Sequence, residues 1–225
     1  MNKLITTKIL LFLYFFCINF LSGHGQTAPG FKIGKLKYGG GGDWYANPSS
    51  LKNLFAFVAK NTRVTISFEE EIVEPGSSAI FQYPMIYATG HGNIIFNEAE
   101  AINLRKYLLS GGFFLIDDNY GLHQFAKREM KKVFPEYDFK EIPHSHPIFK
   151  QHFQFPKGPP KIHEHDNKPP QFLGIFHENR LLCLLTYESD LGDGWEDAEV
   201  HHDPEEVRQK SLQMGTNIIL YILSR

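Results

Sequence analysis

The sequence contains little cysteine and little net charge, and each shortage excludes a class of protein. Two cysteines occur among 225 residues, and the formal net charge at pH 7 is −2. Cys17 lies in an apolar N-terminal run, so the rest of the chain has only Cys183 and no internal disulfide is expected. The small net charge provides no general attraction for acidic polymers, and we predict no nucleic-acid partner.

Standard signatures of catalytic and nucleotide-binding sites are also missing. The chain has no P-loop, no spaced glycines of a dinucleotide-binding fingerprint, and no HExxH or CxxC zinc motif. Cys183 is surrounded by leucines, where a thiol is normally inert. No motif therefore requires a cofactor, and a divalent metal remains an open alternative.

The N-terminal residues predict export. Lys3 and Lys8 precede a nearly apolar run at residues 9–21, and small residues follow as far as Gly25. This order is typical of a secretory signal peptide, and the run is shorter than the roughly 20 residues of a membrane span. We predict a signal peptide at residues 1–25 and one domain at 26–225, periplasmic or secreted, with no stable membrane span after cleavage. An uncleaved anchor is the alternative.

The rest of the chain predicts an α/β fold with an open sheet. Apolar content of 42% and charged content of 21% are typical of globular domains. Strand patterns alternate with helix patterns as far as residue 134. Strands are predicted at residues 31–38, 64–68, 85–88 and 113–116, and helices after Asn47-Pro48, at the Asn97–Glu100 capping box and after Gly121.

The second half of the chain is less periodic. Residues 135–170 are rich in proline, histidine and lysine and predict a long excursion over the surface. Residues 172–176 and 181–186 predict a hairpin, and Asp203-Pro204 predicts the start of the last helix.

Three unusual loops follow predicted strands, at residues 39–45, 89–92 and 117–121. In an open α/β sheet, ligands bind outside the carboxyl ends of the strands. We therefore expect these loops to meet in a cleft, and we expect Gly90 and His91 of the second loop to contact a ligand there.

The glycine loop has two interpretations. Backbone N–H groups of Gly40, Gly41 and Gly42 at a helix N-terminus could hold an anion or a carboxylate, although Asp43 would repel phosphate. Trp44 and Tyr45 beside the glycines suit a flat ligand such as a sugar ring. The alternative is a flexible turn whose aromatic side chains pack on the domain.

The third loop contains two adjacent carboxylates, and Asn119 follows them. Successive side chains of a strand point in opposite directions, so Asp117 or Asp118 faces the cleft while the other caps the next helix. The carboxylate in the cleft could act as a general base or a metal ligand, and the alternative is that both serve only as caps.

Histidine pairs and a second acidic loop complete the candidates. Pairs of the kind that can bind zinc or copper occur at 144/146, 163/165 and 201/202, and the alternative is scattered surface histidine. Residues 190–197 lack the spacing of a calcium-binding EF-hand loop. Asp190 and Trp195 of this loop could complete the cleft, with Trp195 covering the ligand; an exposed turn is the alternative.

These motifs together resemble the bacterial domain-of-unknown-function family 4159 over nearly the whole mature chain. The resemblance is carried by YGGGGDWY (38–45), TGHG (89–92), LRKYL (104–108), GGFFLIDD (111–118), HPIF (146–149) and the 190–195 loop. It implies a flavodoxin-like parallel sheet with helices on both faces, in the class I glutamine-amidotransferase-like superfamily and with a ThuA-like layout. Those amidotransferases carry a nucleophilic cysteine near the position of residues 117–119, where this chain has none, so thioester chemistry is not expected.

Three functions fit these observations. The first is binding of a small polar ligand, with a carbohydrate as one candidate, in the cleft at the strand ends. The second is a hydrolase in the same cleft that uses Asp117 or Asp118, assisted by His91, or a metal. The third is a module that binds another protein of the cell envelope.

Overall fold

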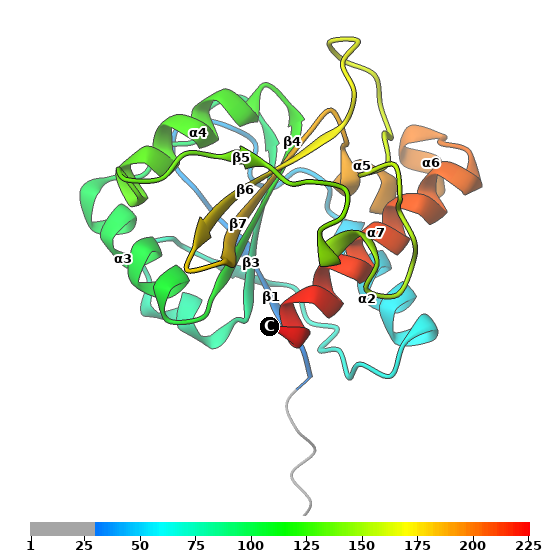
Figure 1. Ribbon diagram of the computed structural model, residues 1–225, viewed down its shortest axis with the longest axis horizontal. Helices are drawn as coiled ribbons and strands as arrows, with labels where there is room; N and C mark the ends of the chain where they lie inside the picture. Colours follow the sequence, from blue (N-terminus) through cyan, green and yellow to red (C-terminus); the bar gives the residue numbers. More distant parts are fainter. Residues whose placement is uncertain (1–29) are drawn as a thin grey trace, which may run out of the picture.

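A seven-stranded sheet forms the centre of the protein, and the computed structural model describes residues 30–225 (Figure 1). The order of the strands across the sheet is β2-β1-β3-β4-β7-β6-β5. Their bounds are β1 (Ile33–Leu36), β2 (Glu71–Val73), β3 (Met85–His91), β4 (Phe113–Tyr120), β5 (Lys140–Glu141), β6 (Gln171–His177) and β7 (Arg180–Tyr187). The predicted signal peptide at 1–25, with Cys17, lies outside the described residues.

Helices cover both faces of the sheet (Figure 1). Their bounds are α2 (Ser50–Asn61), α3 (Glu98–Leu109), α4 (Leu122–Val133), α5 (Leu191–Trp195), α6 (Ala198–His201) and α7 (Glu205–Ser224), with 3-10 turns at Ser78–Gln82 and Pro147–Phe149. Helices α3 and α4 lie on one face, and α2, α5 and α7 lie on the other. Among the described residues, no helix is both long and apolar enough to cross a membrane.

The predicted open α/β sheet is confirmed, although the sheet is only mostly parallel. Strands β2, β1, β3, β4 and β7 pair in parallel, whereas β6 is antiparallel to both β7 and β5. The predicted hairpin is β6–β7, and it supplies the antiparallel edge.

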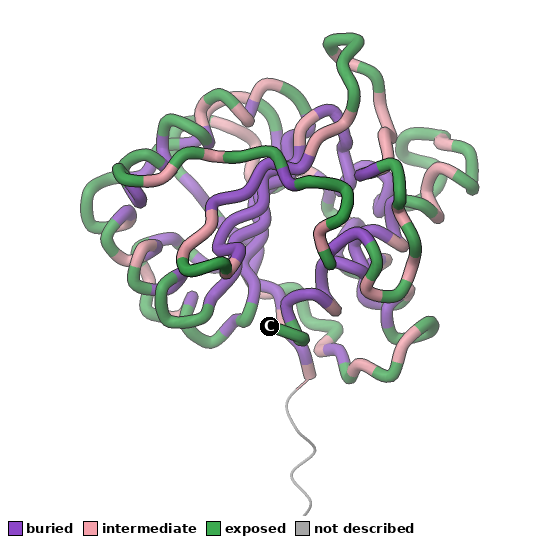
Figure 2. Tube along the Cα trace, viewed as in Figure 1, coloured by how far each residue is buried: buried purple, intermediate pink, exposed green. Residues whose placement is uncertain are grey.

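The central strands are apolar because both of their faces are covered. Nearly every residue of β3 and β4 is buried, and so are those of β7 (Figure 2). Strand β4 is longer than the strand predicted at residues 113–116. It continues through Asp117, Asp118 and Asn119, which are buried as well. These three polar residues belong to the strand itself and need partners inside the protein.

Helix α3 begins at the predicted capping box, in which Asn97 and Glu100 exchange side-chain-to-backbone bonds. Helix α2 begins later than predicted. Asn47 was expected to cap it, but the cap position is Ser49, and Asn47 is buried with a φ of 56°. Its side-chain amide lies instead at the strand ends, where its oxygen accepts a hydrogen bond from Asn119 of β4.

The predicted strand at residues 64–68 is wrong. Ile66 forms only an isolated bridge to Phe31, and the strand beside β1 is β2. The alternation of Val64, Ile66 and Phe68 was misleading because Phe68 is exposed and only Ile66 is well buried. The predicted excursion at 135–170 is confirmed, apart from the two-residue strand β5 and one 3-10 turn.

Candidate functional site

The carboxyl ends of β3, β4 and β7 meet at one edge of the sheet, which we call the carboxyl edge. Thr89 and Gly90 of β3 stand beside Asp117 and Asp118 of β4, and Asp117 stands beside Thr186 of β7. The predicted meeting of residues 89–92 with residues 117–121 is therefore confirmed, whereas a cleft at this edge stays a prediction.

Asp117 holds helix α5 in place. Its Oδ1 accepts hydrogen bonds from the Thr186 hydroxyl (2.6 Å) and the Leu191 N–H (3.2 Å), and its Oδ2 accepts one from the Gly192 N–H (2.6 Å). The carboxylate thus caps the first turn of α5. Burial outweighs these bonds and, together with the nearby carboxylates of Asp190 and Asp193, raises the pKa of Asp117 to about 7.

Asp118 points to the opposite face of the sheet, as the alternation of strand side chains requires. It accepts hydrogen bonds from the backbone N–H of His123 (3.1 Å) and contacts the His123 ring nitrogen Nδ1 (2.6 Å). Asp118 therefore caps α4, so each of the two carboxylates is used by a different helix.

Asp193 of α5 is the centre of a polar cluster on the Asp117 side. Its Oδ1 accepts hydrogen bonds from the side-chain amides of Asn47 (2.9 Å) and Asn119 (2.6 Å). Asn119 also bonds Asn47 (3.0 Å) and accepts from the Thr89 hydroxyl (2.7 Å). The amide network fixes the Asp193 carboxylate and leaves its Oδ2 free for other partners.

Two histidines of the 135–170 excursion reach this cluster. His163 Nδ1 lies 3.1 Å from Asp193 Oδ2 and 3.5 Å from Asp190 Oδ2, while its Nε2 lies 3.2 Å from both oxygens of Asp203. His165 bonds Asp190 through Nε2 and stacks on Tyr120, with ring centroids 4.8 Å apart. Hydrogen bonds to Asp190 and Asp193 raise the pKa of His163 to about 10.

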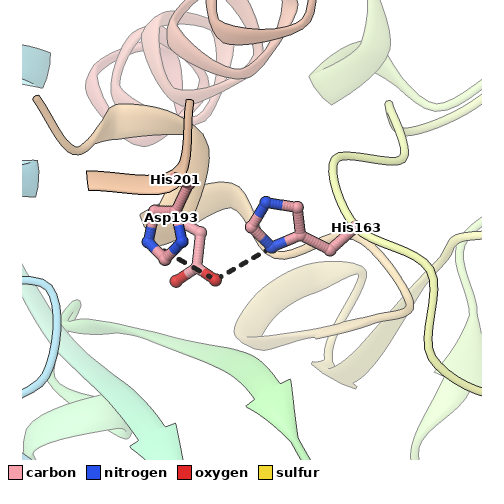
Figure 3. Close-up of side chains that lie close together, drawn as sticks. All are labelled: His163, Asp193 and His201. Atoms are coloured by element: carbon pink, nitrogen blue, oxygen red, sulfur yellow. Dashed lines mark hydrogen bonds and ion pairs between the residues drawn. The ribbon is translucent and has the colours of Figure 1, made fainter. Parts of the chain in front are cut away.

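His201 of α6 approaches the same carboxylate oxygen. Its Nε2 lies 3.9 Å from Asp193 Oδ2, and its ring centroid lies 5.0 Å from that of His163. Figure 3 shows His163 entering from the excursion and Asp193 and His201 from the neighbouring short helices, with all three side chains converging. One atom from each of the three residues can be chosen so that all lie within 4.8 Å of one another, close enough to hold a metal ion.

The turn between β7 and α5 is strained. Glu188 and Asp190 adopt φ angles of 55° and 53°, in the left-handed region that side chains disfavour. Asp190 is fully buried, its Oδ1 has no hydrogen-bond partner within residues 30–225, and burial raises its pKa. Strain and an unpaired buried oxygen in one residue are features of functional sites.

A more exposed Asp–His pair lies where β1 and β3 end. His91 Nδ1 lies 3.0 Å from Asp43 Oδ2, and the His91 N–H donates to Asp43 Oδ1. The His91 side chain is 54% exposed, so its other ring nitrogen is open to water. Gly90 permits this approach, because a Cβ there would lie 2.7 Å from Asp43 oxygens and from the Tyr38 hydroxyl.

The prediction that the glycine loop leads directly to a helix N-terminus is wrong. The Gly42 N–H donates to the Asn93 carbonyl, and α2 begins only at Ser50. Gly40 and Gly41 are exposed and adopt positive φ angles. Trp44 is half-buried and packs edge-on against Tyr45, which is 65% exposed.

Trp195 is not available to cover a ligand, and the predicted 190–197 loop is largely helical. The Trp195 ring is fully buried, packs against Tyr87, and donates its indole N–H to the Ser211 carbonyl. The short helix α5 turns this side chain into the core beneath α7, because Asp117 holds its first turn against the sheet.

The excursion lies across the carboxyl edge. Ile162 donates its N–H to the Ser189 carbonyl (3.0 Å), and Asp166 donates to Glu188 Oε1 (2.7 Å). Lys161 forms an ion pair with Glu188 at 2.9 Å. These contacts bring His163 and His165 to the carboxyl edge, whereas His144 and His146 contact Phe149 and Tyr221 elsewhere.

Sequence reasoning did not select several residues that the structure places at the site. Asn47 and Asp203 were interpreted only as helix caps, and Asp193 was considered only as part of the 190–197 loop. The signals were present: Asn47 follows the glycine loop directly, and Asp203 adjoins a histidine pair. The prediction that Cys183 is buried is confirmed, and burial raises the pKa of its thiol.

Comparison with known families places the chain in one of them. Residues 32–223 match the family described as Domain of unknown function (DUF4159). The match covers most of the chain, so the protein belongs to the DUF4159 family. None of the curated proteins matches it in sequence.

Proposed function

We propose that the protein binds a small polar ligand at the carboxyl edge, in contact with the Asp43–His91 pair. Helix α2 follows β1 on one face of the sheet, and α3 follows β3 on the other. In open α/β sheets, such a change of side marks the ligand site. The observation that carries the proposal is an exposed, carboxylate-oriented histidine at that point.

A carbohydrate or a polyol is the ligand class that these groups suit best. The Asp43 carboxylate and the free ring nitrogen of His91 can both hydrogen-bond hydroxyl groups. Tyr45 provides an exposed aromatic ring two residues from Asp43, against which a flat apolar sugar face can pack.

A ligand screen tests the proposal. Neutral sugars, sugar acids and polyols are compared by thermal shift, and hits are measured by isothermal titration calorimetry. His91→Ala is expected to weaken binding by about tenfold or more, the loss of one good polar contact. His152→Ala serves as the matched control, since His152 is also exposed and contacts Phe153 away from this edge. Equal binding by both variants would contradict the proposal.

A hydrolase is the second candidate, and the orientation of His91 favours it. A carboxylate on Nδ1 leaves Nε2 free to accept a proton from a water molecule, which is the arrangement of a general base. Hydrolysis of nitrophenyl glycosides and esters that Asp43→Asn abolishes while folding is retained would support the enzyme. Binding without turnover would support the binder alone.

The remaining proposals concern the fold family, the location of the protein and a protein partner. A flavodoxin-like, ThuA-like layout related to class I glutamine amidotransferases is supported by five parallel strands with helices on both faces. Export to the periplasm or beyond is supported by the sequence pattern of residues 1–25. An envelope protein partner is supported by the edge strand β2, where Ile72 is 55% exposed.

A further inference from the structure

We infer that His163, Asp193 and His201 form a binding site for one divalent transition-metal ion, with Zn²⁺ as the reference ion. The three side chains come from three separate segments: the excursion, α5 and α6 (Figure 3). Two imidazoles and one carboxylate are ligands typical of zinc and of other first-row divalent metals.

The spacing of the ligand atoms suits a tetrahedral ion. Two ligands bound to zinc at about 2.05 Å stand about 3.3 Å apart at the tetrahedral angle. Asp193 Oδ2 lies 3.1 Å from His163 Nδ1 and 3.9 Å from His201 Nε2. The three ligand atoms together lie within 4.8 Å of one another, so the His201 ring has to move toward the other two ligands to complete the set.

The groups behind the ligands are arranged as metal ligands require. If His163 Nδ1 binds the ion, its Nε2–H points to the Asp203 carboxylate at 3.2 Å, which fixes the ring and its tautomer. The Oδ1 of Asp193 is held by the amides of Asn47 and Asn119, so its Oδ2 is the atom presented to the ion. In both side chains, the protein contact is made by the atom that does not bind the metal: Nε2 of His163 and Oδ1 of Asp193.

Asp190 provides a second, independent indication of a cation site. Its side chain is fully buried, its Oδ2 bonds His165 and lies 3.5 Å from His163 Nδ1, and its Oδ1 has no partner among residues 30–225. A buried carboxylate oxygen without a hydrogen bond is costly in a folded protein. A divalent ion would add positive charge next to Asp190 and Asp193, whose carboxylates otherwise contact His163 and His165.

The His201 side of the site is open, since its side chain is 31% exposed while Asp190 and Asp193 are buried. Water or a substrate oxygen can therefore occupy a remaining coordination position, as in zinc sites with three protein ligands. The inference depends only on these residues and holds whether or not a polar ligand binds at Asp43 and His91.

Metal titration of the purified protein tests the site. The protein is stripped with a chelator, dialysed, and titrated with Zn²⁺ in competition with a fluorescent indicator, and the bound metal is counted by elemental mass spectrometry. We expect one Zn²⁺ per chain. His201→Ala should raise the Kd by at least about 100-fold, and Asp203→Asn by about 10- to 100-fold.

His202→Asn is the matched control, because His202 is the exposed neighbour of His201 and asparagine tolerates its φ of 58°. Its Kd should stay within about threefold of the wild type, the level of an uninvolved residue. Circular dichroism confirms that each variant is folded, and the assay contains no organic ligand. Absence of stoichiometric Zn²⁺, or equal affinity in His201→Ala and His202→Asn, would overturn the inference.

Discussion

Two groups of Asp–His contacts lie at the carboxyl edge, and they differ in how firmly they are held. In the Asp43–His91 pair, both side chains are partly exposed and the imidazole has one protein partner. In the cluster around Asp193, the carboxylate is nine-tenths buried, and two amides fix one of its oxygens. The same residue types therefore occur in an exposed and in a largely buried setting.

The difference indicates different roles. A buried carboxylate that two amides hold by one oxygen suits a metal ion, whose geometry tolerates little displacement of its ligands. A half-exposed histidine with one free nitrogen suits contact with a ligand or with water. Substitutions that disturb the cluster around Asp193 should therefore lower the free energy of unfolding. Substitutions in the Asp43–His91 pair should affect mainly ligand binding.

The largest loss of stability is expected from Gly192→Ala. An added Cβ would clash with the Tyr87 hydroxyl and the Asn47 amide and lie 2.8 Å from Asp117 Oδ2. Such overpacking should lower the free energy of unfolding by about 3 kcal/mol, measured by urea denaturation. Gly41→Ala is the control: nothing lies within 4 Å, and only its φ of 86° opposes the change, at about 1 kcal/mol. Equal losses would contradict the tight packing of α5.

The next largest effect is expected from Asp117→Asn, with a defined pH dependence. The asparagine amide N–H would face a backbone N–H donor of Leu191 or Gly192, which should lower the free energy of unfolding by about 1–3 kcal/mol. Burial raises the native pKa of Asp117 from 3.8 to about 7, so the native state holds an extra proton between these values. The contribution of Asp117 to stability therefore falls as pH rises from about 4 to 7. The stability gap between wild type and variant should narrow over that range; a constant gap would refute the assignment.

A smaller effect is expected from Asp118→Ala, on the other face of the sheet. Loss of the bond to the His123 N–H removes the cap of α4 and should cost about 1–2 kcal/mol in urea denaturation. The Kd for Zn²⁺ should remain within about threefold of the wild type, since Asp118 does not touch the metal ligands. Loss of zinc binding with a folded protein would show that the two faces are coupled.

The smallest effect on stability is expected from Asp43→Asn. The pair with His91 is partly exposed and screened by water, so its loss should cost less than about 1 kcal/mol. Any sugar or polyol found in the screen should nevertheless bind about tenfold more weakly, as measured by calorimetry. A loss of several kcal/mol would mean that the pair is structural.

The sequence allowed the convergence at the carboxyl edge to be predicted, because it depends on local patterns. The alternation of strand and helix places loops at one end of a parallel sheet, and the opposite directions of Asp117 and Asp118 follow from strand geometry. Both expectations agree with the observed pairing and hydrogen bonds.

The partners within the site could not be predicted, because they depend on long-range contacts. Asn119 and Asp193 are 74 residues apart in sequence, and His163 and Asp203 are 40 apart. Residues 190–195 contain two glycines and few helix formers, so the tertiary bond from Asp117, and not local propensity, makes them helical. Trp195 was misplaced for the same reason.

The most direct test of the carboxyl edge as a functional centre is a crystal structure of the protein grown with Zn²⁺, with anomalous data collected above and below the zinc absorption edge. We predict one strong peak among His163 Nδ1, Asp193 Oδ2 and His201 Nε2, with ligand distances of about 2.0–2.2 Å. A map with no peak there, while surface histidines such as His144 or His152 bind zinc, would contradict the account.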